Sequence, residues 1–268
     1  MAVLTRTLTR RQRARITRGV QYLLFAAGIL LLASLADWGQ IRRAFFDLEV
    51  VDAIFPQILT TYLLNTVIYT AAAFAFGLVL GLVLALMRLS SVAPYRWLAN
   101  VYIEFFRGVP ALLVILAFGF GIPIAFNTTF PGGTLGTIAA ALGLVAAAYM
   151  AETIRAGIQA VPRGQTEAAR SLGMSPSWAM VSIVLPQAFR LILPPLTNEL
   201  ILLTKDSSLV YLLGLTLEDR ELAKFSRDAL NQYVSMTPIL VAGLCYLLIT
   251  VPLSYVVRRL EAKAAEAR

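Results

Sequence analysis

The sequence predicts an all-α polytopic membrane protein with about six transmembrane helices. Hydrophobic residues make up 59% of the 268-residue chain and charged residues 14%, and the mean hydropathy is +0.75. An ordinary globular domain is about 45 to 50% apolar and about 25% charged. A helix needs about 20 apolar residues to cross a hydrocarbon core, and six segments suit that role. They are residues 20–37, 57–87, 97–122, 134–156, 191–215 and 237–257.

The segments differ in how clearly they predict a straight helix. The first follows an arginine-rich start, is long for a signal core and has no clear small-x-small cleavage site, so we expect a retained anchor. The second is long enough to tilt. Gly108 and Pro110 predict a kink in the third. Two prolines and several polar residues interrupt the fifth, which is therefore the least regular.

Basic residues predict the orientation of the chain. With six crossings and the N-terminus inside, sixteen of the 23 Lys and Arg residues fall on the inner side, counting Arg155 at the inner end of the fourth span; five fall on the outer side, and two lie deeper within spans. This excess agrees with the positive-inside rule. We therefore expect a multi-pass membrane protein with both termini in the cytoplasm.

The composition also argues against several activities. The chain has no histidine, which excludes a Ser-His protease, an HExxH metalloprotease and a His-ligated haem protein. It has no GxxxxGK[ST] phosphate-binding loop, and its one cysteine, Cys245, excludes an intrachain disulfide and a cysteine metal cluster. The sequence therefore predicts a non-enzymatic chain with no cofactor or metal of its own. Its basic residues are spread along the chain, which does not favour nucleic-acid binding.

A polar loop at residues 157–190 is predicted to lie in the cytoplasm. Residues 166–172 are rich in helix formers, Gly173 suits the left-handed position that ends a helix, and Ser175-Pro176 suits an N-cap and first helical position. A second amphipathic stretch, residues 177–189, leads back to the membrane past Pro186. By composition alone, such a loop could be an ordinary interfacial connector.

The loop resembles a known signature. Glu167-Ala168-Ala169, Gly173 and the run ending at Pro186 are similar to the EAA motif in permease subunits of binding-protein-dependent ABC importers. Further segments are similar to the polar-amino-acid uptake group of these permeases: LALMRLS at 84–90, YIEFFRGVP at 102–110, AETIRAGI at 151–158, Asn198-Glu199, and KDSSL at 205–209.

This resemblance implies an organisation for the chain. It covers residues 57–259, which would form the five-helix core of a type I ABC importer. Residues 1–56 would add a basic tail, an anchor helix and an extracytoplasmic linker, and residues 260–268 would form a cytoplasmic tail. The family partners would be a cytoplasmic ATPase dimer that binds ATP and Mg, a second permease subunit, and an extracytoplasmic solute-binding protein.

The resemblance also implies roles in the loop. The EAA segment would form a coupling helix that sits in a groove of the ATPase. Glu167 would then be a polar anchor, Ala168 and Ala169 would permit close approach, and Gly173 would make the turn.

Ionisable residues inside the spans are candidates for the solute path, because they are costly in a membrane. A zwitterionic amino acid needs a cation near its carboxylate and an acceptor near its ammonium group. Pairing between the charged residues, for example within one helical turn, is the structural alternative. The candidates are the ionisable residues Glu104, Arg107, Glu152, Glu199, Lys205 and Asp206, and the polar Asn198 beside them.

Several functions remain open at this point. The solute could be glutamate, glutamine, cystine or a basic amino acid, or the same machinery could carry a sulfur compound or an organic acid. An ATPase-independent channel or carrier is a further alternative, although it leaves the EAA-like loop unexplained.

Overall fold

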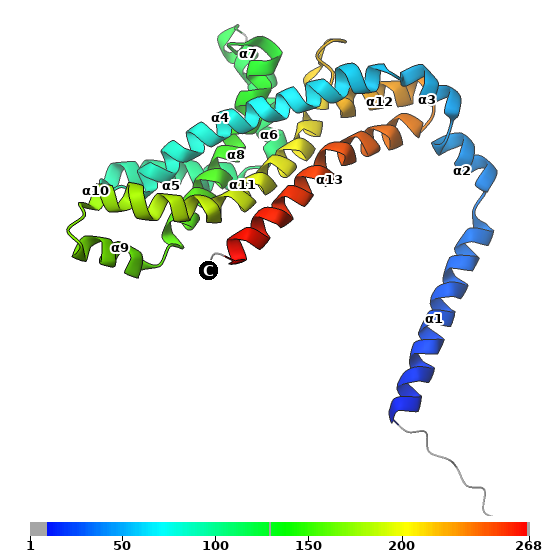
Figure 1. Ribbon diagram of the computed structural model, residues 1–268. Coiled ribbons are helices and arrows are strands. Elements are labelled where there is room, and N and C mark those ends of the chain that lie inside the picture. The colour runs from blue at the N-terminus through cyan, green and yellow to red at the C-terminus, as the bar shows by residue number, and fades with distance from the viewer. Residues whose placement is uncertain (1–9, 129, 267–268) are drawn as a thin grey trace, which may run out of the picture. The chain divides into compact units, whose positions relative to one another are not determined.

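The computed structural model describes residues 10–128 and 130–266, and the regular elements within those ranges are all helices (Figure 1). Contacts divide the chain into a unit that ends at Asp47 and a unit that begins at Leu48. The division predicted from the sequence, at residues 56 and 259, stays a prediction. Part of the predicted basic tail, residues 1–9, and the last two residues lie outside the described ranges.

The N-terminal unit contains α1 (Arg10–Leu35) and α2 (Trp38–Phe45). The Arg15–Leu35 part of α1 is long and apolar enough to cross a membrane, in agreement with the predicted anchor. The short helix α2 was not predicted. Its N-cap is Asp37, whose carboxylate accepts a hydrogen bond from the Gln40 amide at 2.9 Å. This cap gives the chain a new helix start directly after the anchor.

The second unit is a bundle of long and short helices. In chain order these are α3 (Leu48–Ile54), the π-helix η1 (Ile58–Leu63), α4 (Leu64–Leu89), α5 (Ala93–Gly108), α6 (Ala111–Leu116), the π-helix η2 (Ala117–Gly121), α7 (Ile122–Phe126), α8 (Gly133–Gln159), α9 (Arg163–Ser171), α10 (Pro176–Ala179), the π-helix η3 (Met180–Val184), α11 (Leu185–Asp206), the 3₁₀-helix η4 (Ser207–Leu213), α12 (Leu222–Tyr233) and α13 (Thr237–Glu266).

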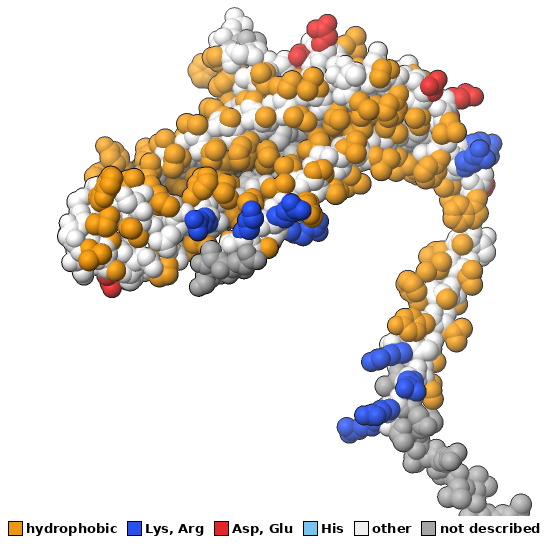
Figure 2. All heavy atoms as spheres, in the orientation of Figure 1, with side chains coloured by type: hydrophobic (Ala, Val, Ile, Leu, Met, Phe, Trp, Pro, Cys, Tyr) orange, Lys and Arg blue, Asp and Glu red, His pale blue; other side chains and the backbone are white. Residues whose placement is uncertain are grey.

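Several helical runs in this unit could cross a membrane by length and composition: Ile58–Leu89, Gly133–Gln159, Pro176–Leu213 and Thr237–Ala264. Within the unit, α4, α11 and α13 run side by side (Figure 1). Hydrophobic side chains cover most of the face of this unit seen in Figure 2. Those exposed on α13 include Leu244, Leu247, Leu248 and Val251. Such a surface suits lipid, because acyl chains are as apolar as these side chains.

The third predicted span, residues 97–122, is not one straight helix. Ala93–Gly108 and Ala111–Phe126 form a pair bent by 103°, and together they make a sixth candidate span only if the pair is counted as one. Val109 between them is extended, with φ −93° and ψ 131°. A residue before proline is pushed out of the helical region, so Pro110 ends α5 and begins α6. The predicted kink is therefore a sharp corner.

The fifth span begins earlier than predicted. The amphipathic stretch at 177–189 and the span at 191–215 form one helical run, Pro176–Leu213, of 38 residues. Pro194 and Pro195 lie inside α11 without ending it. Prolines are tolerated in membrane helices where the freed backbone groups find other partners. The second half of the polar loop and the fifth span are thus one continuous helical run.

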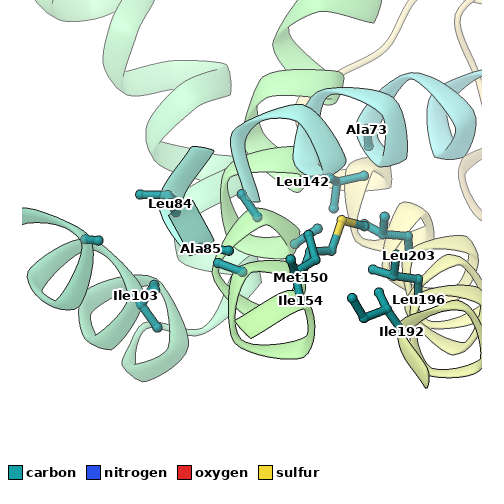
Figure 3. Packing of buried hydrophobic residues seen from close by; sticks show 14 of the residues in the cluster. Ala73, Leu84, Ala85, Ile103, Leu142, Met150, Ile154, Ile192, Leu196 and Leu203 are labelled. Carbon is teal, nitrogen blue, oxygen red and sulfur yellow. The ribbon is translucent and has the colours of Figure 1, made fainter. Parts of the chain in front are cut away.

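The main core lies between α4, α8 and α11. Gly77 and Gly81 of α4 bring the backbones of α4 and α8 together, since a Cβ on Gly77 would lie 3.1 Å from the Gly143 carbonyl oxygen. This agrees with the packing role that a GxxxG pair predicts. In Figure 3, Met150 of α8 lies between Ala85 of α4 and the α11 side chains. The core therefore holds α8 between its two neighbours.

The segment between η4 and α12 is tied to the bundle by hydrogen bonds. The Asn65 side-chain amide of α4 donates to the carbonyl oxygens of Glu218 and Arg220 at 2.7 and 2.8 Å. The Tyr69 hydroxyl donates to the Asp219 carbonyl at 2.8 Å. These bonds hold the start of α12 against α4.

Glu221 caps α12 and is fully buried. Its carboxylate accepts hydrogen bonds from the Ala223 and Lys224 amides at 2.5 and 2.7 Å, and from the Tyr246 hydroxyl at 3.2 Å. Burial raises the pKa of Glu221 to about 7, and these hydrogen bonds oppose that rise. The sequence analysis did not single out this residue.

Candidate functional site

The polar loop contains a sharply defined corner between α9 and α10. Gly173 has φ +84°, its amide donates to the Arg170 carbonyl at 3.0 Å, and the Met174 amide donates to the Ala169 carbonyl at 3.1 Å. This pair of bonds is the Schellman motif that ends a helix in a left-handed residue. The predicted helix at 166–172 and the predicted role of Gly173 in the turn are confirmed.

The next helix begins as the sequence predicts. Ser175 is the N-cap of α10 and its hydroxyl accepts a hydrogen bond from the Trp178 amide at 3.3 Å, while Pro176 takes the first turn. Both helix ends at the corner are therefore satisfied by local bonds. The corner holds its shape without help from a partner.

The exposed face of α9 is the face available to a partner protein. Glu167 and Ala168 are exposed, and Leu172 at the end of α9 is 85% exposed. Ala169 is 5% exposed and faces inward, so in this conformation it cannot provide the close approach to a partner that the resemblance implies. Pro186 lies in the first turn of α11 and does not belong to the corner.

A cavity of about 420 Å³ lies where the bent pair α5/α6 meets α8 and α11. Its volume is within the usual range for small-molecule sites, about 300 to 1,000 Å³. Its wall from α5 and α6 is Arg107 to Ala111, the corner itself. The cavity therefore exists because the third span turns at Val109 and Pro110.

The helices α8 and α11 complete the cavity, each with one face. On each helix the residues that line the cavity are spaced three and four apart, and this spacing places them on the same face of the helix. The lining residues are Leu142, Val145, Ala146 and Tyr149 of α8, and Glu199, Leu202, Leu203 and Asp206 of α11.

The cavity gathers three of the predicted solute-path residues. Arg107, Glu199 and Asp206 line it together. The Arg107 guanidinium lies 5.8 Å from the centre of the Tyr149 ring, within reach of a cation–π interaction. A guanidinium on one wall and two carboxylates on another can bind a solute that carries both signs of charge.

Glu152 lies outside this cavity, and its role in the solute path stays a prediction. Its carboxylate forms ion pairs with Arg88 of α4 and Arg155 of α8, and Arg155 also donates to Gln159. It does not line the cavity. Its place between two guanidinium groups makes it a structural link between α4 and α8.

Three further candidates lie outside the cavity. Glu104, Asn198 and Lys205 are exposed, and none of them lines it. Glu104 and Arg107 lie within one helical turn, the arrangement given above as the structural alternative, but among the residues that the structure describes no ion pair joins them.

Tyr149 was not predicted to be a site residue. It lies one turn before Thr153 in an apolar segment, and no motif or charged residue in the turn that precedes it indicates a binding role. The signal that could have found it is the helical repeat from Leu142, which places Tyr149 on one face of α8 with Val145.

Comparisons with known proteins agree with this architecture. Residues 77–266 match the family model described as "Binding-protein-dependent transport system inner membrane component". The chain is 39% identical over 200 residues to the probable glutamine ABC transporter permease protein GlnM of Bacillus subtilis, covering 74% of this chain and 88% of the relative. It is 37% identical over 187 residues to the arginine transport system permease protein ArtQ of the same organism, covering 70% and 83%.

A solved structure is similar over most of the chain. It is described as the crystal structure of an amino acid ABC transporter with histidines, and it matches with a TM-score of 0.72 and 34% sequence identity. The match covers 81% of this chain and 98% of the other.

Proposed function

The chain belongs to the family of binding-protein-dependent transport system inner membrane components, and from that membership we propose that it forms the solute path of an ATP-driven importer for polar amino acids. One observation carries the proposal. A single helical run, Pro176–Leu213, begins at the α9–α10 corner and contains Glu199 and Asp206, which line the charged cavity. Relatives whose names assign them to probable glutamine transport and to arginine transport support the amino-acid class.

The exposed face of α9 is the proposed contact with a cytoplasmic ATPase dimer. Glu167 and Ala168 would meet the partner, and Gly173 would keep the corner rigid. ATP and Mg would be bound by the ATPase, since this chain has no GxxxxGK[ST] loop.

Movement of the ATPases would reach the cavity through the backbone. A displacement at α10 is carried along η3 into α11, where Glu199 and Asp206 line the cavity. A rigid helix that joins two sites can bias one according to the state of the other. Nucleotide and a loaded solute-binding protein would then stabilise the inward and outward states differently.

The remaining partners and the orientation are also part of the proposal. A second permease subunit, the same or a related chain, would complete the assembly, and an extracytoplasmic binding protein would deliver the solute. The excess of basic residues on the predicted inner side supports cytoplasmic termini in a bacterial plasma or inner membrane.

Reconstitution tests this function. The chain is produced with its ATPase and binding protein, placed in proteoliposomes and assayed for uptake of radiolabelled amino acids with ATP on the ATPase side. We expect uptake that needs ATP, and ATP hydrolysis that rises when the loaded binding protein is added. Equal uptake by vesicles that contain this chain without an ATPase would contradict the proposal.

A further inference from the structure

The cavity between α5, α8 and α11 carries unequal numbers of positive and negative groups. Its charged lining residues are Arg107, Glu199 and Asp206, so carboxyl groups outnumber guanidinium groups by two to one. The charge of Lys205, the residue before Asp206, attracts the Asp206 carboxyl group, but the Lys205 side chain is exposed and does not line the cavity. When both carboxyl groups are ionised, as they are beside a cationic solute, the lining alone carries one unbalanced negative charge.

The two carboxylates are spaced along the wall. Glu199 and Asp206 are seven residues apart on the same face of α11, which corresponds to about 10 Å along the helix axis. One ammonium group is a compact charge, and beside one of these carboxylates it leaves the other without a close partner. The wall offers two positions for cationic groups, and Arg107 offers one for a carboxylate.

We propose that the solute held in this cavity is an amino acid with a cationic side chain, such as lysine or arginine. This inference rests on the proposed function, in which the cavity holds the transported solute. The solute carboxylate pairs with Arg107, and its α-ammonium group and side-chain cation pair with Glu199 and Asp206.

Charge balance is the physical reason for this selectivity. A cationic amino acid carries two positive groups and one negative group, so its charge of +1 neutralises the lining. A zwitterion such as glutamine leaves one carboxylate unpaired, and glutamate adds a further negative charge. An uncompensated charge inside a membrane protein is costly, so the cavity favours the solute that leaves none.

The test measures binding to the permease without the binding protein, because the binding protein has a selectivity of its own. Equilibrium binding of radiolabelled L-lysine, L-arginine, L-glutamine and L-glutamate is measured on the purified complex of this chain with its ATPase in detergent. We expect lysine or arginine to bind at least about tenfold more tightly than glutamine, the effect of one charge-assisted contact.

Substitutions assign the preference to the cavity. Glu199→Gln and, independently, Asp206→Asn each keep the shape of the side chain and remove one charge, and each should bring the ratio of lysine to glutamine affinity close to one. Glu218→Gln removes an exposed carboxylate outside the cavity and should leave the ratio unchanged. Thermal unfolding of each complex shows whether the variant is folded, and either cavity variant suffices if the other is not.

Each other outcome has a definite meaning. Tighter binding of glutamine or glutamate than of lysine overturns the inference, as does a ratio that neither cavity variant changes, or failure of all four solutes to bind. ATP-dependent uptake of glutamine but not lysine in proteoliposomes would overturn the cationic class and leave the importer function standing. Uptake that does not depend on ATP would instead contradict the proposed function.

Discussion

Gly81 of α4 packs directly against Met150 of α8. A Cβ atom on Gly81 would lie 2.9 Å from the Met150 Cβ and 3.0 Å from the Ala147 carbonyl oxygen. Real Cβ atoms essentially never show a contact as short as the first, and the second is tight and made to backbone, which does not move away easily. The α4–α8 contact therefore depends on the absence of a side chain at residue 81.

Gly81→Ala should destabilise the protein because the added methyl group forces α4 and α8 apart. Overpacking in a tight core costs about 1 to 3 kcal/mol, more than the gain of up to about 1 kcal/mol from replacing glycine by alanine in a helix. Thermal unfolding in detergent measures the change. The control is Gly243→Ala on α13, where a Cβ meets nothing within 4 Å, so this variant should be as stable as the wild type or more. Equal midpoints for Gly81→Ala and wild type would refute the packing argument.

Glu152→Ala should lower stability and leave solute binding unchanged. The substitution removes the partner of both Arg88 and Arg155, whose side chains are 23% and 22% exposed. Leaving two partly buried guanidinium groups without that carboxylate should cost roughly 1 to 2 kcal/mol, less than for a fully buried pair. Glu104→Ala, which removes an exposed carboxylate, is the control and should keep the wild-type midpoint. Loss of solute binding with an unchanged unfolding midpoint would instead favour the role in the solute path predicted from the sequence.

The stability of the protein should fall as the pH rises through the range set by Glu221. Its pKa is raised from 4.5 to about 7 when folded, so between these values the folded state binds more protons than the unfolded state. The contribution of this group is therefore full below the unfolded value and lost above about 7, with a size of at most about 3 kcal/mol. Glu221→Gln, which has no proton to lose, should flatten this part of the profile. Unfolding midpoints of both proteins between pH 4 and 8 give the difference, and parallel profiles would contradict the assignment.

Local chemistry explains what could be predicted from the sequence. The α9–α10 corner depends on Gly173, Ser175 and Pro176, which lie within four residues of one another, and their conformational preferences are properties of the residues themselves. The apolar segments are equally local, since the length of each is set by the membrane and not by its neighbours. Both features are therefore visible without a structure.

The rest depends on which residues distant in sequence meet. Glu152 is paired with Arg88, 64 residues away, and no pattern in either segment indicates the other. Pro110 predicts a kink but not the angle of 103° that creates the cavity, because the angle depends on what α6 packs against. Glu221 reads as a polar loop residue, yet it is buried: Tyr246 of α13 donates to its carboxylate, and the amide of the next residue, Leu222, donates to Thr66 of α4. The places of the helices along the chain could therefore be predicted, but the contacts between residues distant in sequence could not.

Ala168 and Ala169 offer a direct test of the docking face, since they are neighbours on α9 with opposite exposure. Ala168 is exposed, and Ala169 is 5% exposed. Ala168→Leu should leave the unfolding midpoint of the isolated chain nearly unchanged, because surface substitutions usually act within about 0.5 kcal/mol. It should lower the stimulation of ATP hydrolysis by the loaded binding protein, because the larger side chain faces the proposed ATPase contact. Ala169→Leu should instead lower the midpoint, by about 1 to 3 kcal/mol, because it overpacks the inside of the loop. Both properties are measured on the same preparations, the midpoint without the ATPase and the stimulation with it. If Ala168→Leu couples as well as wild type, α9 does not dock through this face.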